Sequence, residues 1–509
     1  MSHGILTLLA IIPIVWLILS LGVFKMRGDL ACLIGLVITI ILSIVGFNFT
    51  VVESLSAALE GIVMAFWPIV YVIIAAVFTY NISSESGGME KIKDMLTAIS
   101  SDMRILVLLL AWGFGGFLEA IAGFGTAVAI PASILAVLGM SPIKAAIICL
   151  IANTTPTAFG AIGLPVTTLA QVTGLEVKQL SLVVTLQLCA LIILIPFCLV
   201  TLTGNSFKSI KGVFWITLAS GLSFSIPQIF VSKYLGAELP SIVGSLVCII
   251  VTIVLVKFIG PKETEKHEIT PVTPKEGFMA WLPFILVFIF IIASSSLVPP
   301  IHNALGSVKT TLTIFQGSHA KPYVINWLTA PGTLIIIATI LGGLFQGMSF
   351  GTIMSILWKT VKQMTKTMVT VASIVGLSKV MGYSGMINNI AISLVLLTGS
   401  FYPFISPIIG ALGTFITGSD TSANVLFGEL QVKAAHTLKV NPYWLAAANM
   451  AGATAGKMIS PQSIAVATGA TGLAGEEGTI LKQAMKFCAI YTLIICCVIF
   501  GIGKIFGQI

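Results

Sequence analysis

Charged residues are scarce in this sequence, and their scarcity excludes a soluble protein. Of the 509 residues, 9% are Asp, Glu, Lys or Arg and 57% are hydrophobic, and the mean hydropathy is +1.08. A soluble surface typically needs about a quarter of the residues to be charged. The composition therefore predicts an all-α polytopic membrane protein, because helices satisfy their own backbone hydrogen bonds in lipid.

Motifs for disulfides, metals and catalysis are also missing. There is no CxxC pair, no HExxH motif and no acid pair set among histidines, which argues against a zinc site or an intramembrane enzyme. All cysteines lie in apolar runs, where we expect them to pack as small side chains: Cys32, Cys149, Cys189, Cys198, Cys248, Cys488, Cys496 and Cys497. The histidines show no ligand spacing: His3, His267, His302, His319 and His436. We therefore expect no catalytic residues, no metal and no bound cofactor.

The net charge of +8 raises the question of a nucleic-acid partner. No basic cluster is interleaved with stacking aromatic residues, so none is expected. Lysines that anchor cytoplasmic loops explain the positive excess. The apolar N-terminal stretch lacks a basic start and a small-residue cleavage site, so we expect a retained first helix there.

Apolar windows of about twenty residues predict the membrane spans. These windows are 5–24, 30–47, 61–80, 142–170, 181–203, 212–231, 239–258, 278–298, 330–348, 367–382, 442–468 and 486–506. Two further regions, 104–138 and 402–437, are apolar but interrupted. The longer polar stretches, 260–277 and 299–329, are expected to be surface loops.

Basic residues predict the orientation through the positive-inside rule. The expected cytoplasmic set is Lys25, Arg27, Lys91, Lys93, Lys208, Lys211, residues 257–275, Lys359, Lys362 and Lys366. The path that satisfies this set starts outside and requires 104–138 to enter and leave on the cytoplasmic side. On the same path 402–437 enters and leaves on the outer side, which places Lys433 and Lys439 outside.

The chain also contains an internal repeat. Segments at Gly87 and Gly115 recur at Ser384 and Gly413 with one common offset, which indicates a repeat. The predicted parts are an extra N-terminal transmembrane helix (1–29), a first repeat (30–203), connecting helices and loops (204–329) and a second repeat (330–509). An even number of crossings in each repeat and an odd number between them make the repeats inverted, which is typical of secondary transporters.

Each repeat is predicted to contain a reentrant hairpin. Regions 104–138 and 402–437 are each too short for two full spans of about twenty residues with a turn. The first turn falls at Ala122–Thr126, where glycines free the backbone to donate to an anion. The second falls at Gly418–Asn424, which is rich in helix-capping residues.

A broken helix is predicted to follow each hairpin, at 142–170 and 442–468. We expect these helices to unwind at Asn153–Pro165 and Asn449–Pro461, because proline removes a helix hydrogen bond. Unwound backbone at membrane depth is tolerated only where it lines a cavity or packs against protein. Tips and unwound segments should therefore meet at the centre, and their amides, hydroxyls and helix N-termini suit a small carboxylate.

Ionisable residues deep in the membrane are the candidates for coupling and binding. Glu119 and Asp420 are candidate proton carriers, and either could instead be a member of a structural ion pair. Lys457 either holds the substrate carboxylate or pairs with Asp420, and the sequence leaves both open. Lys379, near the end of its span, is expected to snorkel to the outer surface.

Several stretches resemble the L-lactate permease family of bacteria. They are GGFLEAIAGFGTAVAIP, IANTTPTAFGAIGLP, FITGSDTSANVLFGELQ and NPYWLAAANMAGATAGKMISPQSIAVA. The resemblance implies uptake of L-lactate, and often D-lactate and glycolate, by proton symport across the bacterial cytoplasmic membrane. It also implies the fold of the ion transporter superfamily, in which a transport domain moves on a scaffold domain as an elevator, often in a homodimer.

Carried onto this chain, the resemblance implies a substrate site at the hairpin tips and the broken helices. Its residues are Gly123, Phe124, Gly125, Thr126, Asn153, Thr154, Thr155, Ser419, Asp420, Thr421, Ser422, Asn424, Gly452, Thr454 and Lys457. The proton is the coupling ion in this hypothesis, and the expected partners are a small carboxylate and the lipid bilayer. The alternative is a sodium-coupled carboxylate symporter, since the same hydroxyls and carbonyls suit Na⁺. A channel is disfavoured because broken, paired helices suit alternating access.

Overall fold

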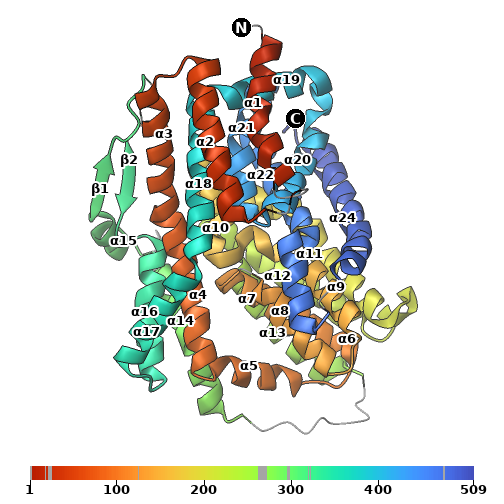
Figure 1. Cartoon of the computed structure of the whole chain (residues 1–509). Helices are drawn as coiled ribbons and strands as arrows, with labels where there is room; N and C mark the ends of the chain where they lie inside the picture. Colours follow the sequence, from red (N-terminus) through yellow and green to blue (C-terminus); the bar gives the residue numbers. More distant parts are fainter. Residues whose placement is uncertain are drawn as a thin grey trace.

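The chain folds almost entirely into helices (Figure 1). The structure is a computed structural model that describes residues 3–17, 19–20, 24, 26–123, 125–261, 272–294, 298–318, 320, 322–473 and 476–509. In these residues, 9 helical segments are long and apolar enough to cross a membrane, and a bent helix pair raises the number to 10. The prediction of a polytopic helical membrane protein is therefore confirmed.

Among the N-terminal helices, α1 and α2 pack as a pair, and α3 and α4 follow as one long helical segment with a break in it. The N-terminal helices are α1 (His3–Leu17), α2 (Gly28–Phe47), α3 (Val51–Met64), α4 (Tyr71–Glu85) and α5 (Gly88–Thr97). α3 and α4 are joined through η2 (Ala65–Val70), a short stretch of wider helix in which Trp67 has extended dihedrals (φ −128°, ψ 116°). Pro68 explains this break, because proline cannot donate the amide hydrogen bond that a helix interior needs.

The region 104–138 forms a helical hairpin with unequal arms. Its elements are α6 (Met103–Leu106), η3 (Val107–Phe114), α7 (Gly115–Ile121) and α8 (Thr126–Val137). The arm from Met103 to Ile121 is long enough to span a membrane by itself, so it is longer than the predicted half-helix. Gly123 and Gly125 turn the chain with φ of 61° and 86°, which only glycine adopts at little cost.

The helix after this hairpin is broken, as predicted. Its parts are α9 (Pro142–Ala152), η4 (Thr155–Phe159) and α10 (Gly160–Thr173), and its two halves are bent by 46°. The break falls inside the stretch from Asn153 to Pro165 that the prolines predicted. Non-helical backbone therefore lies beside the hairpin turn in space, since a Cβ at Gly123 would lie 3.4 Å from the Cβ of Ala161.

The connecting region holds helices and one small sheet. Its elements, with the helix that leads into it, are α11 (Val177–Gly204), η5 (Phe207–Ile210), α12 (Phe214–Tyr234), α13 (Pro240–Ile259), α14 (Pro274–Ser294), α15 (Pro299–Gly306), β1 (Lys309–Leu312) and β2 (Tyr323–Asn326). The strands pair antiparallel, with Lys309 opposite Asn326 and Leu312 opposite Tyr323. The stretch 299–329 is therefore not a plain surface loop, and the chain is not purely α-helical.

The second half repeats the order of hairpin and following helix. Its elements are α16 (Pro331–Phe345), α17 (Phe350–Gln363), α18 (Thr365–Tyr383), α19 (Met386–Thr398), η6 (Gly399–Phe401), α20 (Tyr402–Thr417), α21 (Asp420–Leu438), α22 (Pro442–Ile459), α23 (Pro461–Thr471) and α24 (Glu477–Ile505). α22 is helical through Ile459, so the predicted unwinding from Asn449 onward is wrong. The break is confined to Ser460, which caps α23 by accepting from the Ser463 amide at 3.2 Å. Pro461 is sufficient to end α22, whereas the glycines before it are held helical by packing.

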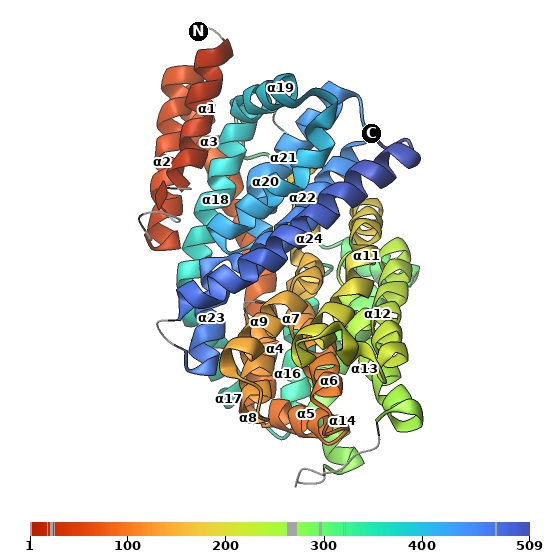
Figure 2. The same cartoon turned by 90° about the vertical axis from the view of Figure 1, so that its right-hand side faces the viewer.

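Figure 2 shows how the two halves are arranged. α6–α9 lie in its lower half, whereas α19–α22 lie in its upper half, at the end that carries the N-terminus. The halves interlock between these ends, because α10 packs against α21 and α8 packs against α23. The turns of both hairpins therefore approach one central region.

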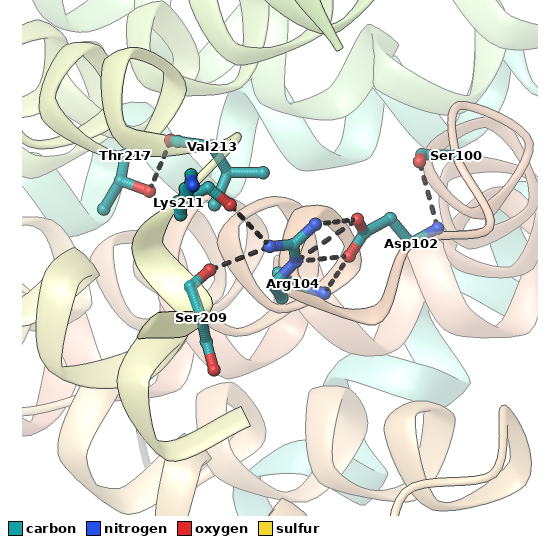
Figure 3. Close-up of polar contacts among 7 residues, drawn as sticks. All are labelled: Ser100, Asp102, Arg104, Ser209, Lys211, Val213 and Thr217. Atoms are coloured by element: carbon teal, nitrogen blue, oxygen red, sulfur yellow. Dashed lines mark hydrogen bonds and ion pairs between the residues drawn. The ribbon is translucent and has the colours of Figure 1, made fainter. Parts of the chain in front are cut away.

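Arg104 anchors the start of the first hairpin to the connection between α11 and α12 (Figure 3). Its guanidinium donates to Asp102 Oδ2 at 2.7 Å and to the carbonyls of Ser209 and Lys211 at 2.8 and 3.1 Å. Burial of Asp102 opposes its ionisation, yet the hydrogen bonds from Arg104 outweigh burial and hold the pKa of that carboxyl below its ordinary value. One end of the first arm is thus fixed while the other reaches the centre.

Glycines let α20 and α22 pack backbone against backbone. A Cβ at Gly452 would lie 1.8 Å from the carbonyl oxygen of Pro407, and a Cβ at Gly456 would lie 2.1 Å from that of Ala411. Small residues spaced one helical turn apart are typical of tight helix pairs in membranes. The second hairpin is therefore held closely on α22.

We predict that Gly452→Ala destabilises the folded protein, because the new methyl group forces the two backbones apart. Overpacking of this kind costs about 1–3 kcal/mol, so the midpoint of thermal unfolding in detergent should fall. Gly501→Ala on α24 is the matched control, since nothing lies within 4 Å of its Cβ position. Equal midpoints for the two variants would contradict this packing account.

Candidate substrate site

A cavity of about 440 Å³ lies where the two halves meet. Its inner lining comes from both hairpins and both broken helices: Glu119, Gly123, Thr157, Gly160, Ala161, Leu164, Pro165, residues 416–422, Lys457, Pro461 and Gln462. It reaches the surface at the starts of α2 and α18, where Arg27 and Lys366 are exposed. We call this opening, lined by Met26–Asp29, Lys366, Thr367, Thr370 and Val371, the mouth. The volume suits one small organic molecule.

Two buried carboxylates face this cavity. Glu119 and Asp420 are each 4% exposed. Within the described part of the chain, Glu119 Oε2 and both carboxylate oxygens of Asp420 have no hydrogen-bond partner. Buried polar atoms are almost always paired, so two buried carboxylates with unpaired oxygens in one cavity indicate a site that receives a polar ligand or a proton.

Lys457 supplies the positive charge of the cavity. Its ammonium donates to the carbonyl of Gly418 at 2.8 Å and lies within electrostatic range of Glu119 and Asp420. Among the described residues it forms no ion pair with Asp420, so the second of the two alternatives, a Lys457–Asp420 pair, is absent from this structure. Lys457 also lies on the helical part of α22, and not in an unwound segment as predicted.

The start of α10 is a strained turn beside Glu119. Ala161, Ile162 and Gly163 have left-handed φ of 43°, 57° and 74°. For the two non-glycine residues this conformation costs on the order of 1 kcal/mol or more each, and it persists only where surrounding packing imposes it. A Cβ at Gly160 would lie 2.7 Å from Glu119 Oε1, so glycine there lets the carboxylate approach the turn.

The second hairpin presents the start of α21 to the cavity. Ser419 caps this helix by accepting from the Ser422 amide at 3.3 Å, and Asp420 lies in its first turn. The N-terminus of a helix carries partial positive charge and stabilises a negative group nearby. This end of α21 therefore suits the carboxylate of Asp420 or that of a bound anion.

The predicted site residues fall into two groups. Those that line the cavity are Gly123, Ser419, Asp420, Thr421, Ser422 and Lys457. Those found outside its lining are Gly125, Thr126, Asn153, Thr154, Thr155, Asn424, Gly452 and Thr454. Phe124 lies outside the described residues, as do His267 and His319.

Members of the second group have contacts that position the site. Asn424 donates to the Pro165 carbonyl at 3.0 Å and accepts from Asn449 at 3.0 Å, so it joins α21 to α10 and α22. The Thr454 hydroxyl contacts the Tyr491 hydroxyl at 2.8 Å. These amide and hydroxyl groups are engaged within the protein, and they hold the second hairpin in place.

Lys379 does not snorkel to the surface as predicted. Its ammonium pairs with the buried carboxylate of Glu60 at 3.0 Å. Glu60 was not predicted as a buried charge, because it falls next to the predicted start of a span, where a carboxylate is expected to be exposed. A lysine inside a span is itself a signal, since such a charge needs a partner in the protein.

A GxSxG stretch at Gly347–Gly351 has a local structural role. In hydrolases this pattern holds a nucleophilic serine on a strand-to-helix turn. Here the preceding element is the helix α16, and the exposed Ser349 caps α17 by accepting from the Thr352 amide at 3.1 Å. The motif therefore starts a helix and lies apart from the cavity lining.

Known permeases resemble this chain over nearly its whole length. The sequence model of the family described as L-lactate permease matches residues 6–506. An L-lactate permease of Streptococcus iniae is 68% identical over 86% of this chain and 93% of the relative. An L-lactate permease of Bacillus subtilis is 35% identical over 97% of this chain and 95% of the relative. The glycolate permease GlcA of Escherichia coli K12 is 34% identical over 97% and 94%, respectively.

Two solved structures share the fold. The YdaH transporter of Alcanivorax borkumensis superposes with a TM-score of 0.53 and 13% identity, covering 94% of this chain and 99% of that one. MtrF of Neisseria gonorrhoeae gives 0.52 and 13%, covering 93% and 94%. The family match and the helices long enough to cross a membrane make this a multi-pass protein of the bacterial cytoplasmic membrane. The chain belongs to the L-lactate permease family.

Proposed function

We propose that the chain transports L-lactate and related 2-hydroxymonocarboxylates, D-lactate and glycolate, across the membrane together with protons. The observation that carries this proposal is the arrangement of Glu119 and Asp420 beside Lys457 in one cavity. The names of the relatives, which include L-lactate permeases and a glycolate permease, support the substrate class.

Lys457 is the proposed partner of the substrate carboxylate. An ammonium has three donors, and the one that bonds to Gly418 leaves the others for a ligand. Thr157 and Ser422 line the same cavity. The Thr157 hydroxyl donates to the Thr154 carbonyl at 2.6 Å and can accept from the 2-hydroxyl group of lactate, while the Ser422 hydroxyl can donate or accept. The partial positive charge at the start of α21 adds to the attraction of the anion.

The charge balance of the cavity is the reason for proposing a proton. With both acids ionised, two negative charges face the single charge of Lys457, and a substrate anion would add a third. Burying a charge without a partner is costly. Protonation of either Glu119 or Asp420 lowers the excess of negative charge with the anion bound from two to one, which favours binding of the substrate together with a proton. The argument holds for either acid.

We further propose that residues 30–203 and 330–509 are inverted repeats that carry the site between the two sides as an elevator. The placement of α6–α9 and α19–α22 at opposite ends of the molecule (Figure 2) supports this arrangement. In it, both hairpins, α10 and α22 form the transport domain, and α2, α3 and α18 belong to the scaffold domain. A homodimer is the assembly that we expect from the family resemblance.

Asp420→Asn should uncouple transport. Asparagine keeps the shape of the side chain but cannot take up or release a proton, so lactate accumulation driven by a pH gradient should be lost while lactate exchange continues. Accumulation and exchange are measured in the same proteoliposomes, with Glu119→Gln in parallel. Asp94→Asn on α5 is the control, because its carboxylate lies far outside the cavity lining. Full accumulation by Asp420→Asn would show that Asp420 does not carry the proton.

Lys457→Ala should weaken lactate binding. Hydrogen bonds to charged groups contribute about 1.5–3 kcal/mol, so the dissociation constant should rise by roughly tenfold or more. Binding to purified protein is measured by titration calorimetry, with the exposed Lys482→Ala on α24 as the matched control. An unchanged dissociation constant would reduce Lys457 to a structural partner of Gly418.

A further inference from the structure

A strap of the connecting region lies along α3, apart from the cavity lining. We define the strap as two segments: residues 309–316, which are β1 and the four residues after it, and residues 323–326, which are β2. Figure 1 shows its strands beside α3 at the left edge of the molecule. Two anchors fix the strap, one at Phe315 and one at Tyr323, and they contact different parts of the protein.

The first anchor is built around the buried carboxylate of Glu60 on α3. Glu60 is 3% exposed, and it accepts from the Lys379 ammonium at 3.0 Å and the Tyr383 hydroxyl at 2.7 Å. Its other oxygen accepts from the backbone amide of Phe315 at 3.3 Å. A buried ion pair is costly unless further hydrogen bonds complete it, and here the strap itself provides one of them.

Ring stacking and a second backbone bond complete this anchor. The Phe315 ring is buried and stacks on Tyr383 with centroids 3.9 Å apart and planes 9° apart. On its other side Phe315 faces Phe49 at 6.3 Å. The Gln316 amide donates to Ser56 Oγ at 3.1 Å. The strap is therefore bound between α3 and α18, and not merely laid over them.

This anchor and the mouth lie at opposite ends of the same two helices. α2 begins at Gly28 and α18 at Thr365, beside the mouth, whereas Phe49 follows the end of α2 and Tyr383 ends α18. The two helices pack against each other. Twenty helical residues cover about 30 Å, which is the thickness of the hydrocarbon core. α2 is one of the segments long and apolar enough to cross a membrane, and in a membrane that it crosses the strap and the mouth face opposite sides.

The second anchor joins the strap to an element that lines the cavity. The Tyr323 hydroxyl accepts from Gln171 Nε2 at 3.1 Å and donates to the Trp67 carbonyl. Gln171 lies on α10, whose first turns, from Gly160 to Pro165, line the cavity. A movement of α10 therefore displaces the strap or breaks the Tyr323–Gln171 hydrogen bond.

We propose that the strap is the gate on the side of the membrane opposite the mouth, with Glu60, Lys379 and Tyr323 as its positioning residues. The Glu60–Lys379 anchor holds the strap on α3 and α18, and the Tyr323–Gln171 bond closes it onto α10. Substrate entry from that side requires the Tyr323–Gln171 bond to break. This proposal rests on the transport function proposed above, because a gate is needed only if a solute crosses the membrane through the protein.

The test measures access to the cavity from the strap side. Ile416→Cys places a thiol in the cavity lining, and intact cells are treated with a membrane-impermeant thiol reagent. The chain without this change gives the background from its own cysteines. Lys379→Met and Tyr323→Phe, each added to the reporter, should speed labelling from outside by about tenfold or more, because each shifts the population toward the open gate.

Two controls separate gating from misfolding. Lys379→Arg keeps the charge and should label at nearly the parent rate. Glu276→Gln removes an exposed ion pair with Lys91, which joins α5 and α14 away from the strap, and it should also leave labelling unchanged. Tyr323→Phe removes a single hydroxyl, so it tests the gate even if Lys379→Met does not fold.

Parent-like labelling of both Lys379→Met and Tyr323→Phe would overturn the gate. Labelling is measured without lactate, so this result does not depend on the proposed substrate. Protection of Ile416→Cys by added lactate tests that substrate separately. Faster labelling without lactate protection would keep the gate and contradict the proposed function.

Discussion

Two carboxylates and one ammonium are buried together inside a bundle of apolar helices, and the rest of the structure depends on that constraint. Glu119 and Asp420 are each 4% exposed and retain unpaired oxygen atoms in the described part of the chain. Lys457 faces both, bonded to a carbonyl and not to either acid. An arrangement with more buried negative than positive charge is unstable unless protons or ligands complete it. This incompleteness is the reason for proposing that the cavity binds an anion together with a proton.

Much of the surrounding backbone serves to bring these groups together. The left-handed residues Ala161–Gly163 and the turn at Gly123 and Gly125 allow the broken helix and the first hairpin to meet at Glu119. Gly452 sets the distance between α20 and α22, and thereby the position of the start of α21. The mouth and the strap, at the two ends of α2 and α18, differ in structure. The mouth is open and carries exposed cations, whereas at the other end of α2 and α18 the strap is anchored by the buried carboxylate of Glu60, which is bonded through both of its oxygens.

The sequence predicts the parts of this structure that depend on local chemistry. Apolar runs predict the helices, prolines predict the break in α10, and paired glycines predict the turn of the first hairpin. Glu119, Asp420 and Lys457 are recognisable because a charge inside an apolar run is costly. What could not be predicted depends on contacts distant in sequence. Glu60 and Lys379 are 319 residues apart, and the amide of Asn424 meets Asn449 and Pro165 where local composition suggested a substrate contact. The helical course of α22 through its glycines likewise follows from packing on α20.

The central claim is that buried acids couple the entry of a carboxylate to protons. Its most direct test is lactate uptake by proteoliposomes that contain the purified protein, with a pH gradient and a Na⁺ gradient imposed separately. Accumulation should follow the pH gradient, acid outside, and should be the same with or without Na⁺. Accumulation that follows the Na⁺ gradient and ignores the pH gradient would contradict the account.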